Sequence, residues 1–596
     1  MKKDEINARV NSLRDIMQQN GIQAVIVPQT DPHMGEYLAD HWQIRRWLSG
    51  FTGSAGDLVV TRTEAFVWAD SRYWLQAASQ LDGTCIGVME DGKPQTPSIA
   101  SYLCSALHAG DTVGIDGMVF SANAATALQS QLATAGIKLR VDFNPIDLIW
   151  LNRPSIPANE AFIHDEKYSG QSAGDKIAAV LQNAERAGAS ATFISDLAEI
   201  AWTLNLRSSD VECNPVLTSF LYLGADEKCL FVDPAKIPAD VMTYLDKVGV
   251  KTLPYTDVAK FLGTLPDDVK VLINPAQTSI AISTILGKRA VEGASPVAML
   301  KAVKNPVQLQ GVRNAMVRDG VALVSAFMEL EQRMADGVPT TEIDVADLLL
   351  KYRSASPMFF DLSFETIAGF GPHGAIVHYS ANEASNATLH PDSLLLVDSG
   401  ANYLDGTTDI TRTISLGTPT NEQRHDFTLV MKGHISLATA FYPEGTRGAQ
   451  LDVLARINLW KEGLSYLHGT GHGVGHFLNV HEGPQSIRLN DTMAPLTPGM
   501  ITSNEPGLYR EGQYGIRCEN LVLTTEAFTT DFGRFYAFET LTLFPFDLTL
   551  FDTAIMTDAE IDWVNAYHAM VRERLMPHLS EAARAWLIDK TRTLTR

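Results

Sequence analysis

The sequence predicts a protein of mixed α/β and α+β class, in which two α/β domains precede a larger α+β domain. Three observations lead to this prediction. The chain has 596 residues, more than a single hydrophobic core usually covers. Its first half alternates short β-rich runs with helical patterns. At Asn305-Pro306 this alternation gives way to a long amphipathic helix, followed by mixed strands and helices.

The first α/β domain is expected over residues 1–156. An apolar run at 22–27 and two strand-like runs between 57 and 70 are followed by a helical pattern from about Tyr73. This alternation is typical of a small α/β domain. The segment 152–157 contains Pro154 and Pro157, and this composition indicates a linker to the next domain.

The second α/β domain is expected over residues 157–304. Its strand candidates are 192–195, 229–232 and 269–273. The stretch Phe220–Asp233 consists of a strand, a polar turn, a second strand and an Asp, and it resembles Leu58–Asp70 in the first domain. The similarity suggests an old duplication, although hairpins that end in Asp are common.

The third domain is expected over residues 305–596. Asn305 is a favourable N-cap and Pro306 a favourable first helical residue, so a helix should begin there. A capping box at Thr420 and Gln423 predicts another helix. The expected helices are 305–337, 340–353, 420–441 and 450–462, and the expected strands are 367–370, 394–398, 411–416, 501–504 and 521–524. Strands flanked by helices in this way indicate an α+β domain.

The composition excludes several classes of partner. The net charge is −22, and no basic cluster is longer than a pair, so we expect neither nucleic acid nor an anionic membrane as a partner. The N-terminus is charged, and no run of about 18 apolar residues occurs, so we expect neither a secretory signal nor a membrane span. Five cysteines without CxxC spacing are typical of reduced thiols in a cytoplasmic protein.

The unusual polar residues concentrate in the third domain. Asp398 follows an apolar run, and Asp409 precedes a second β-rich run, so the two carboxylates could face one another across a hairpin. A glycine-rich segment surrounds His472 and should bring its imidazole close to a ligand. Two more carboxylates follow short strands. Together the set comprises Asp398, Asp409, His472, Glu505 and Glu519.

Each of these residues alone is better explained as an ordinary cap, turn or structural residue, but the ordered set indicates a metal site. Several buried carboxylates in one pocket are costly unless cations compensate them. Two divalent metals would supply about the right charge, and oxygen-rich ligation with one imidazole favours Mn, Co or Zn. A pair of such metals can hold a bridging hydroxide and polarise a carbonyl, which is the apparatus for hydrolysis.

At these five residues the sequence resembles the metallopeptidases of the pita-bread fold, the family that includes methionine aminopeptidase, prolidase, creatinase and aminopeptidase P. The resemblance implies that Asp398 chelates one metal, that Asp409 and Glu519 bridge both, and that His472 and Glu505 bind the second. It covers roughly residues 365 to 545.

Motifs outside that region resemble the long cytosolic form of the Xaa-Pro aminopeptidases. They are Trp-Leu-Ser-Gly-Phe-Thr-Gly-Ser-Ala-Gly-Asp at 47–57, Asp-Ser-Arg-Tyr-Trp at 70–74 and Asp-Leu-Ala-Glu-Ile-Ala-Trp-Thr-Leu-Asn at 196–205. The resemblance implies two creatinase-like N-terminal domains, a pita-bread catalytic domain, a homodimer and manganese as the metal. The implied reaction is hydrolysis of the bond between an N-terminal residue and a penultimate proline in peptides, by a hydroxide that bridges the two metals.

Three further histidines fall in motifs of the same family, at 371–379 and 468–475 and just beyond. The resemblance implies that His378, His468 and His481 lie near the scissile bond and the proline pocket. Their imidazoles can transfer protons and donate hydrogen bonds near neutral pH. We assign His378 to stabilisation of the intermediate and His481 to positioning of the substrate carbonyl.

The resemblance also implies roles for residues near Glu505, which is the candidate proton shuttle. Tyr509 and Arg517 should line the site, with Arg517 orienting Glu519 or a substrate carbonyl. His476 departs from the family pattern, which has a small or apolar residue there, and we expect it at the surface or behind the ligands and not on a metal.

Two alternatives remain open on the sequence. A prolidase shares the ligand set and the preference for proline, but it cleaves only dipeptides and resembles a two-domain chain. A non-catalytic binding protein on the same scaffold, of the histone-chaperone type, would have lost ligands that are all present here.

Overall fold

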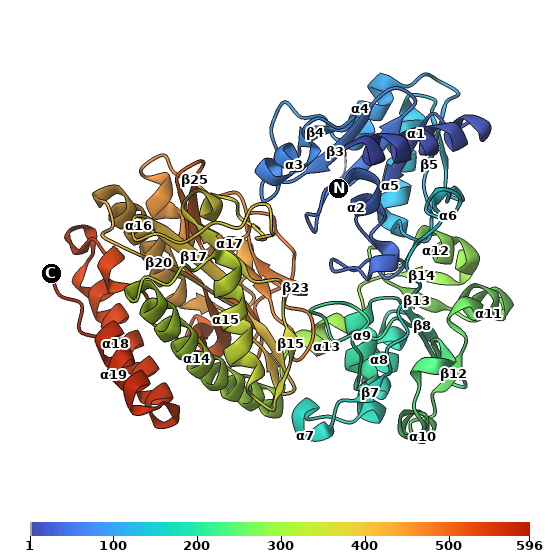
Figure 1. Cartoon of the computed structure of the whole chain (residues 1–596). Coiled ribbons are helices and arrows are strands. Elements are labelled where there is room, and N and C mark those ends of the chain that lie inside the picture. The colour runs from blue at the N-terminus through green and yellow to red at the C-terminus, as the bar shows by residue number, and fades with distance from the viewer. Residues whose placement is uncertain (1–2) are drawn as a thin grey trace. The chain divides into compact units, whose positions relative to one another are not determined.

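The computed structural model describes residues 3–596, which divide into two compact units (Figure 1). The first unit contains the residues up to Glu166 and Gln171–Val297. The second contains Lys167–Gly170 and Ala298–Arg596. None of the helices within residues 3–596 is both long and apolar enough to cross a lipid bilayer.

The first half of the first unit is a six-stranded sheet in the order β4-β3-β2-β1-β5-β6. Its strands are β1 (Ala24–Val27), β2 (Asp57–Thr61), β3 (Ala65–Ala69), β4 (Gly87–Glu90), β5 (Thr112–Gly114) and β6 (Lys138–Arg140), and its main helices are α1 (Lys3–Gln19), α2 (Ile44–Ser49), α3 (Trp74–Leu81), α4 (Ile99–Ala106) and α5 (Ala122–Thr134). Two separate apolar clusters pack against the sheet, one of them around α1 and the other around α4 and α5.

The second half repeats this topology, with the strand order β12-β11-β10-β8-β13-β14. Its strands are β8 (Ala191–Ile194), β10 (Phe220–Gly224), β11 (Lys228–Phe231), β12 (Lys251–Leu253), β13 (Val271–Ile273) and β14 (Ala290–Glu292), and its main helices are α8 (Ala173–Arg186), α9 (Leu197–Leu204), α10 (Ala239–Lys247), α11 (Val258–Thr264) and α12 (Ile280–Leu286). Parallel and antiparallel pairings occur at the same places in both sheets. The β2-β3 and β10-β11 hairpins are the two segments that resemble one another in sequence, so the shared topology supports a duplication.

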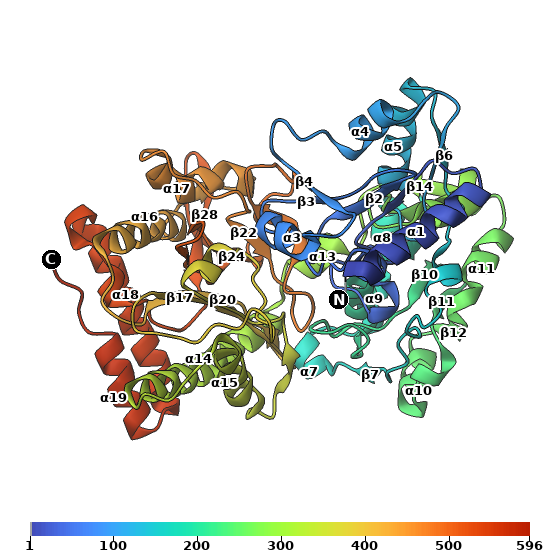
Figure 2. The ribbon, with the colours of Figure 1, turned by 45° about the horizontal axis from the view of Figure 1, so that its top comes forward.

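In the second unit, β17 and β20 lie between two pairs of helices, α14 with α15 on one side and α16 with α17 on the other, as Figure 2 shows. The helices are α14 (Pro306–Ala335), α15 (Glu342–Ser354), α16 (Asn421–Ala438), α17 (Gly448–Trp460), α18 (Asp558–Leu575) and α19 (Glu581–Lys590). One sheet has the order β16-β17-β20, with β16 (Ile367–Phe370), β17 (Leu394–Ser399) and β20 (Ile410–Ser415). The other has the order β21-β28-β27-β24-β22-β23, with β21 (Tyr442–Pro443), β28 (Gly533–Thr540), β27 (Asn520–Thr530), β24 (Ile501–Asn504), β22 (Gly471–Gly473) and β23 (Glu482–Ile487).

Local sequence signals fix the helices of this unit. Asn305 accepts a hydrogen bond from the Gln308 backbone and Gln308 returns one, so α14 begins with a capping box and with Pro306 at its first turn. The predicted capping box of Thr420 and Gln423 likewise opens α16. One large apolar cluster, which draws on α14, α16, α18 and both sheets, forms the core. The strands that carry the predicted site are therefore held on a buried, rigid framework.

Candidate metal centre

Strand pairing in the second unit places the two aspartates on one face. β17 and β20 are antiparallel neighbours, and Asp398 lies opposite Thr411 in their register. Asp409 precedes Thr411 by two positions, so its side chain points to the same face as that of Thr411. The short strands β18 (Ala401–Tyr403) and β19 (Gly406–Thr407) lie between the two aspartates in sequence, so the connection between β17 and β20 contains strands of its own.

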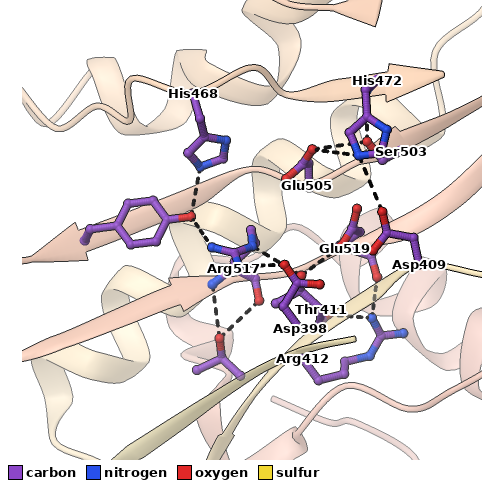
Figure 3. A network of polar contacts seen from close by, with 12 residues as sticks. Asp398, Asp409, Thr411, Arg412, His468, His472, Ser503, Glu505, Arg517 and Glu519 are labelled. Atoms are coloured by element: carbon purple, nitrogen blue, oxygen red, sulfur yellow. Dashed lines mark hydrogen bonds and ion pairs between the residues drawn. The ribbon is translucent and has the colours of Figure 1, made fainter. Parts of the chain in front are cut away.

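Three of the five predicted ligands converge closely (Figure 3). Asp409, His472 and Glu519 each offer a donor atom, and these atoms all lie within 4.8 Å of one another. His472 Nε2 is 3.4 Å from Asp409 Oδ2 and 3.5 Å from Glu505 Oε1. Glu505, in the turn between β24 and β25 (Gly507–Arg510), therefore adjoins the same nitrogen of His472 as Asp409 does.

The imidazole of His472 is oriented by its backbone neighbours. Its Nδ1 lies 2.9 Å from the carbonyl oxygen of Gly473, which is an acceptor only, so Nδ1 carries a proton. In the metal-free site the protonated Nε2 faces Asp409 and Glu505, and a bound cation would take the place of that proton. The His472 backbone N–H donates to Ser503 Oγ, and that hydroxyl donates to Glu505 Oε1 at 3.2 Å. Ser503, which sequence reasoning missed, thus links the two predicted ligands.

Asp398 is held by Arg517. The guanidinium donates to Asp398 Oδ2 at 2.7 Å, whereas Asp398 Oδ1 is buried and has no hydrogen-bond partner within residues 3–596. Arg517 reaches Glu519 through Thr411 and not by a direct bond. It donates to Thr411 Oγ1, and that hydroxyl donates to Glu519 Oε2 at 2.8 Å. Arg517 therefore fixes Asp398 through its Oδ2 only. Asp398 Oδ1 remains available to a cation.

A hydrogen-bonded chain connects Arg517 to one of the predicted histidines. Arg517 Nη1 donates to the Tyr509 hydroxyl at 2.8 Å, and that hydroxyl lies 2.8 Å from His468 Nε2. Because His468 Nδ1 contacts the Gly469 carbonyl, its Nε2 accepts the proton of Tyr509. Arg517 therefore adjoins the cluster through Asp398, Tyr509 contacts Arg517, and His468 lies one residue further out, as Figure 3 shows for Arg517 and His468.

The electrostatics of the cluster fit divalent cations. Burial raises the pKa of Asp398 and of Glu505, the latter to about 7, and raises that of Glu519 well above its usual range, with neighbouring carboxylates adding to the effect. Burial alone would lower the pKa of His472, but Asp409 and Glu505 outweigh it and raise the value to about 9. Four carboxylates that repel one another in a buried site, with unused oxygen lone pairs and one imidazole nitrogen, are a suitable donor set for two divalent metals.

The other histidines lie at different distances from the cluster. The His481 ring packs edge-on against His472, with ring centroids 4.4 Å apart. His378 lies half-buried in the loop between β16 and β17. His476 is only 2% exposed and is outside the group of converging donor atoms, so it is not at the surface.

Glu342 anchors the loop that carries His378, a role that sequence reasoning missed. Its buried carboxylate accepts hydrogen bonds from Phe370 N, His373 Nδ1, Tyr379 Oη and Ala387 N. These donors lie on both sides of His378 in the chain, at 2.8–2.9 Å from the carboxylate oxygens. Four such bonds to one carboxylate fix the loop, and only the tertiary structure reveals them.

Comparison with known proteins agrees with this architecture. The catalytic region matches metallopeptidase family M24 over residues 310–526 and the C-terminal region of peptidase M24 over 534–594. Residues 9–146 and 152–308 each match the creatinase/prolidase N-terminal domain.

Whole-length relatives are also found. The chain is 40% identical to aminopeptidase P2 of Arabidopsis thaliana, covering 99% of this chain and 89% of that protein. It is 42% identical to a probable Xaa-Pro aminopeptidase P of Laccaria bicolor, covering 97% and 92%. The crystal structure of X-prolyl aminopeptidase from Caenorhabditis elegans, described as a cytosolic enzyme with a di-nuclear active site, superposes with a TM-score of 0.95 at 34% identity and covers 100% of both chains.

The repeated α/β lobes, the acidic cluster on antiparallel strands and the family matches define a metal-dependent hydrolase with an M24 catalytic domain. The chain belongs to the Xaa-Pro aminopeptidase family. The predicted fold, two creatinase-like domains followed by a pita-bread domain, is confirmed, as is the prediction of a metallopeptidase with a site for two divalent metals.

Proposed function

We propose that this metallopeptidase removes the N-terminal residue from peptides whose second residue is proline, and that manganese is its metal, with Co or Zn as substitutes. The convergence of Asp409, His472 and Glu519 within 4.8 Å carries the proposal, because it provides the donor set on which such chemistry depends. The names of the whole-length relatives support the choice of substrate. Prolidase activity, the alternative, has no comparable support over the full chain.

The ligand roles in this proposal follow the contacts of each side chain. Asp398 would hold a metal through Oδ1, the oxygen that Arg517 leaves unused. Asp409 and Glu519 would contribute to both metal positions. His472, through Nε2, and Glu505 would complete the second position. When bound, two such cations supply Lewis acidity and lower the pKa of water toward neutrality.

The remaining steps belong to side chains of this protein. Glu505 accepts the proton of the attacking water and delivers it to the leaving imino nitrogen, a role that suits a carboxylate whose Oε1 is placed by the Ser503 hydroxyl beside His472. His481, which contacts His472, positions the substrate carbonyl, and His378 donates a hydrogen bond to the oxyanion that develops. His468 and Tyr509 form the wall on the Arg517 side and contact the substrate there.

The test compares three peptides on metal-stripped enzyme. We expect an Xaa-Pro-Yaa tripeptide to be cleaved after its first residue once Mn²⁺, Co²⁺ or Zn²⁺ is restored, whereas the Xaa-Pro dipeptide and an Xaa-Ala-Yaa tripeptide remain uncut. Cleavage of the dipeptide alone would make the protein a prolidase. Cleavage of none of the three, with metals bound, would favour a binding protein.

The domain limits and the cellular location also belong to this proposal. We place the domains at 1–156, 157–304 and 305–596, in keeping with the matched ranges 9–146, 152–308 and 310–526. The C. elegans structure is described as a cytosolic enzyme, and the reduced cysteines fit a cytoplasmic location for this protein as well.

A homodimer is the proposed assembly, and α17 provides its candidate interface. Val453, Ile457 and Trp460 are spaced at i, i+4 and i+7 on this helix and are 39%, 37% and 40% exposed. A row of exposed apolar side chains on one helix face is typical of an interaction surface. We expect sedimentation equilibrium to show a dimer that Ile457→Lys dissociates. Ile588→Lys, which alters a more exposed apolar residue on α19, should not dissociate it, and a monomeric parent protein would refute the assignment.

A further inference from the structure

Glu482 is a buried carboxylate beside the metal centre that none of the proposed roles uses. It directly follows His481 at the start of β23, and it is 4% exposed. In the register of β22 and β23 it lies opposite Gly473, the residue after the proposed metal ligand His472. Glu482 therefore lies on the strand pair that holds both of these histidines.

Two lysines from the segment ahead of α14 neutralise this carboxylate. Lys301, in α13 (Ala298–Ala302), has its Nζ 2.8 Å from Glu482 Oε2, and Lys304 Nζ lies 2.7 Å from Oε1. The side chains of Lys301, Lys304 and Glu482 are 7%, 1% and 1% exposed. Lys304 also donates to the Lys301 carbonyl at 2.9 Å, which ties the two lysines together. A charge buried to this degree is tolerated only when paired in this way.

Glu482 is packed closely against the strand that carries His472. A Cβ atom added to Gly473 would lie 2.0 Å from the Glu482 carbonyl oxygen, and one added to Gly475 would lie 2.9 Å from Glu482 Oε2. Neither position has room for a side chain, so Glu482 packs directly against the segment that follows His472. The ionic contacts of Glu482 thus bear directly on the placement of His472 and His481.

We propose that Lys301 and Lys304 are positioning residues, which lock Glu482 and thereby hold His472 and His481 in their working geometry. This inference rests on the proposed function for its catalytic consequence, but its structural part does not. The two lysines lie 178 and more residues before Glu482 in sequence, in the segment that opens the catalytic unit. That segment consequently contacts the strand pair that presents His472.

The structural part is tested on the metal-free full chain by amide hydrogen exchange. Lys304→Met removes one of the two positive charges that contact Glu482, with little change in side-chain shape. We expect faster amide hydrogen exchange at residues 471–487. Lys236→Met is the matched control, because Lys236 forms an equally buried pair with Asp210 in the first unit, at 1% and 0% exposure. It should leave exchange at 471–487 unchanged. Unchanged exchange in Lys304→Met as well would overturn the proposal.

The catalytic part is tested with saturating Mn²⁺ and the Xaa-Pro-Yaa tripeptide. We expect Lys304→Met to lower kcat by about tenfold or more with less than about a twofold change in KM, since a displaced supporting residue impairs the chemistry more than the binding. Lys236→Met should retain the parent kcat. If Lys304→Met does not fold, the milder variant Lys301→Met takes its place in the kinetic test. Retention of the full parent kcat by Lys301→Met would then refute the positioning role of the lysines.

The two parts fail separately. If the parent enzyme cleaves none of the peptides, the proposed function is wrong, whereas the exchange result still reports whether the lysines order β22 and β23. If the parent is active and the exchange is unaffected in the lysine variants, the positioning role is wrong and the proposed function stands.

Discussion

Asp409→Asn is expected to lower kcat/KM for an Xaa-Pro-Yaa peptide by about 1,000-fold or more, since loss of a direct ligand should exceed the 10- to 100-fold cost of losing a supporting residue. Asparagine keeps the shape of the side chain and one oxygen but loses the negative charge that would offset two cations. Asp409 also lies within 4.8 Å of His472 and Glu519 and would bridge both metals. The measurements are steady-state kinetics and the bound metal per chain by elemental mass spectrometry.

Asp392→Asn serves as the control for Asp409→Asn. Asp392 is exposed just before β17 and belongs to no ligand set, so its variant should retain parent kinetics and metal content. Full turnover by Asp409→Asn with both metals still bound would show that this carboxylate is not a bridging ligand.

The metal-free protein is expected to lose stability as the pH rises from about 5 to about 8, and added Mn²⁺ should restore it most strongly at the higher pH. The pKa of Glu505 rises from 4.5 in its ordinary state to about 7 in the folded site, chiefly through burial. Because the folded pKa is the higher one, its contribution to the free energy of unfolding is complete below pH 4.5 and is lost as the pH rises through about 7. The shift corresponds to about 3 kcal/mol.

The other groups of the cluster whose pKa is raised also lose their stabilising contribution as the pH rises. Burial raises the pKa of Asp398 and Glu519, so ionising them also destabilises the metal-free fold. His472, whose pKa Asp409 and Glu505 raise to about 9 against the effect of burial, stabilises the fold fully below 6.5 and loses that contribution as the pH rises through about 9. All these contributions decline with rising pH in the absence of metal.

The variant Glu505→Gln distinguishes the contribution of this carboxyl group to the pH dependence of stability from that of the other charges in the protein. The chain carries a net charge of −22, so general repulsion also changes with pH, but it is the same in both proteins apart from one carboxylate. Calorimetric melting temperatures of the metal-free proteins should therefore fall less steeply with pH in Glu505→Gln than in the parent. Equal slopes would contradict the link between this carboxyl and stability.

The sequence alone was sufficient for the elements whose signals are local. The capping boxes at Asn305 and Thr420 depend on residues three positions apart, and both helices begin where these boxes lie. The strand β16 is found at the predicted residues, and β17 extends the predicted run by one residue. The five proposed ligands were recognisable because buried acidic residues in β-rich and glycine-rich contexts are rare without a cation to neutralise them.

The tertiary structure decided how these residues are supported. Arg517 bonds Asp398 and not Glu519, because the register of β17 and β20 puts Thr411 between the guanidinium and Glu519. Glu342 holds a loop that begins 28 residues later, and Lys304 pairs with Glu482 across 178 residues. Such partners share no periodicity or spacing that a linear pattern could reveal. They are set by how the strands pair and the core packs, so the sequence determined which chemistry the protein carries, and only the fold determined which side chains hold it in place.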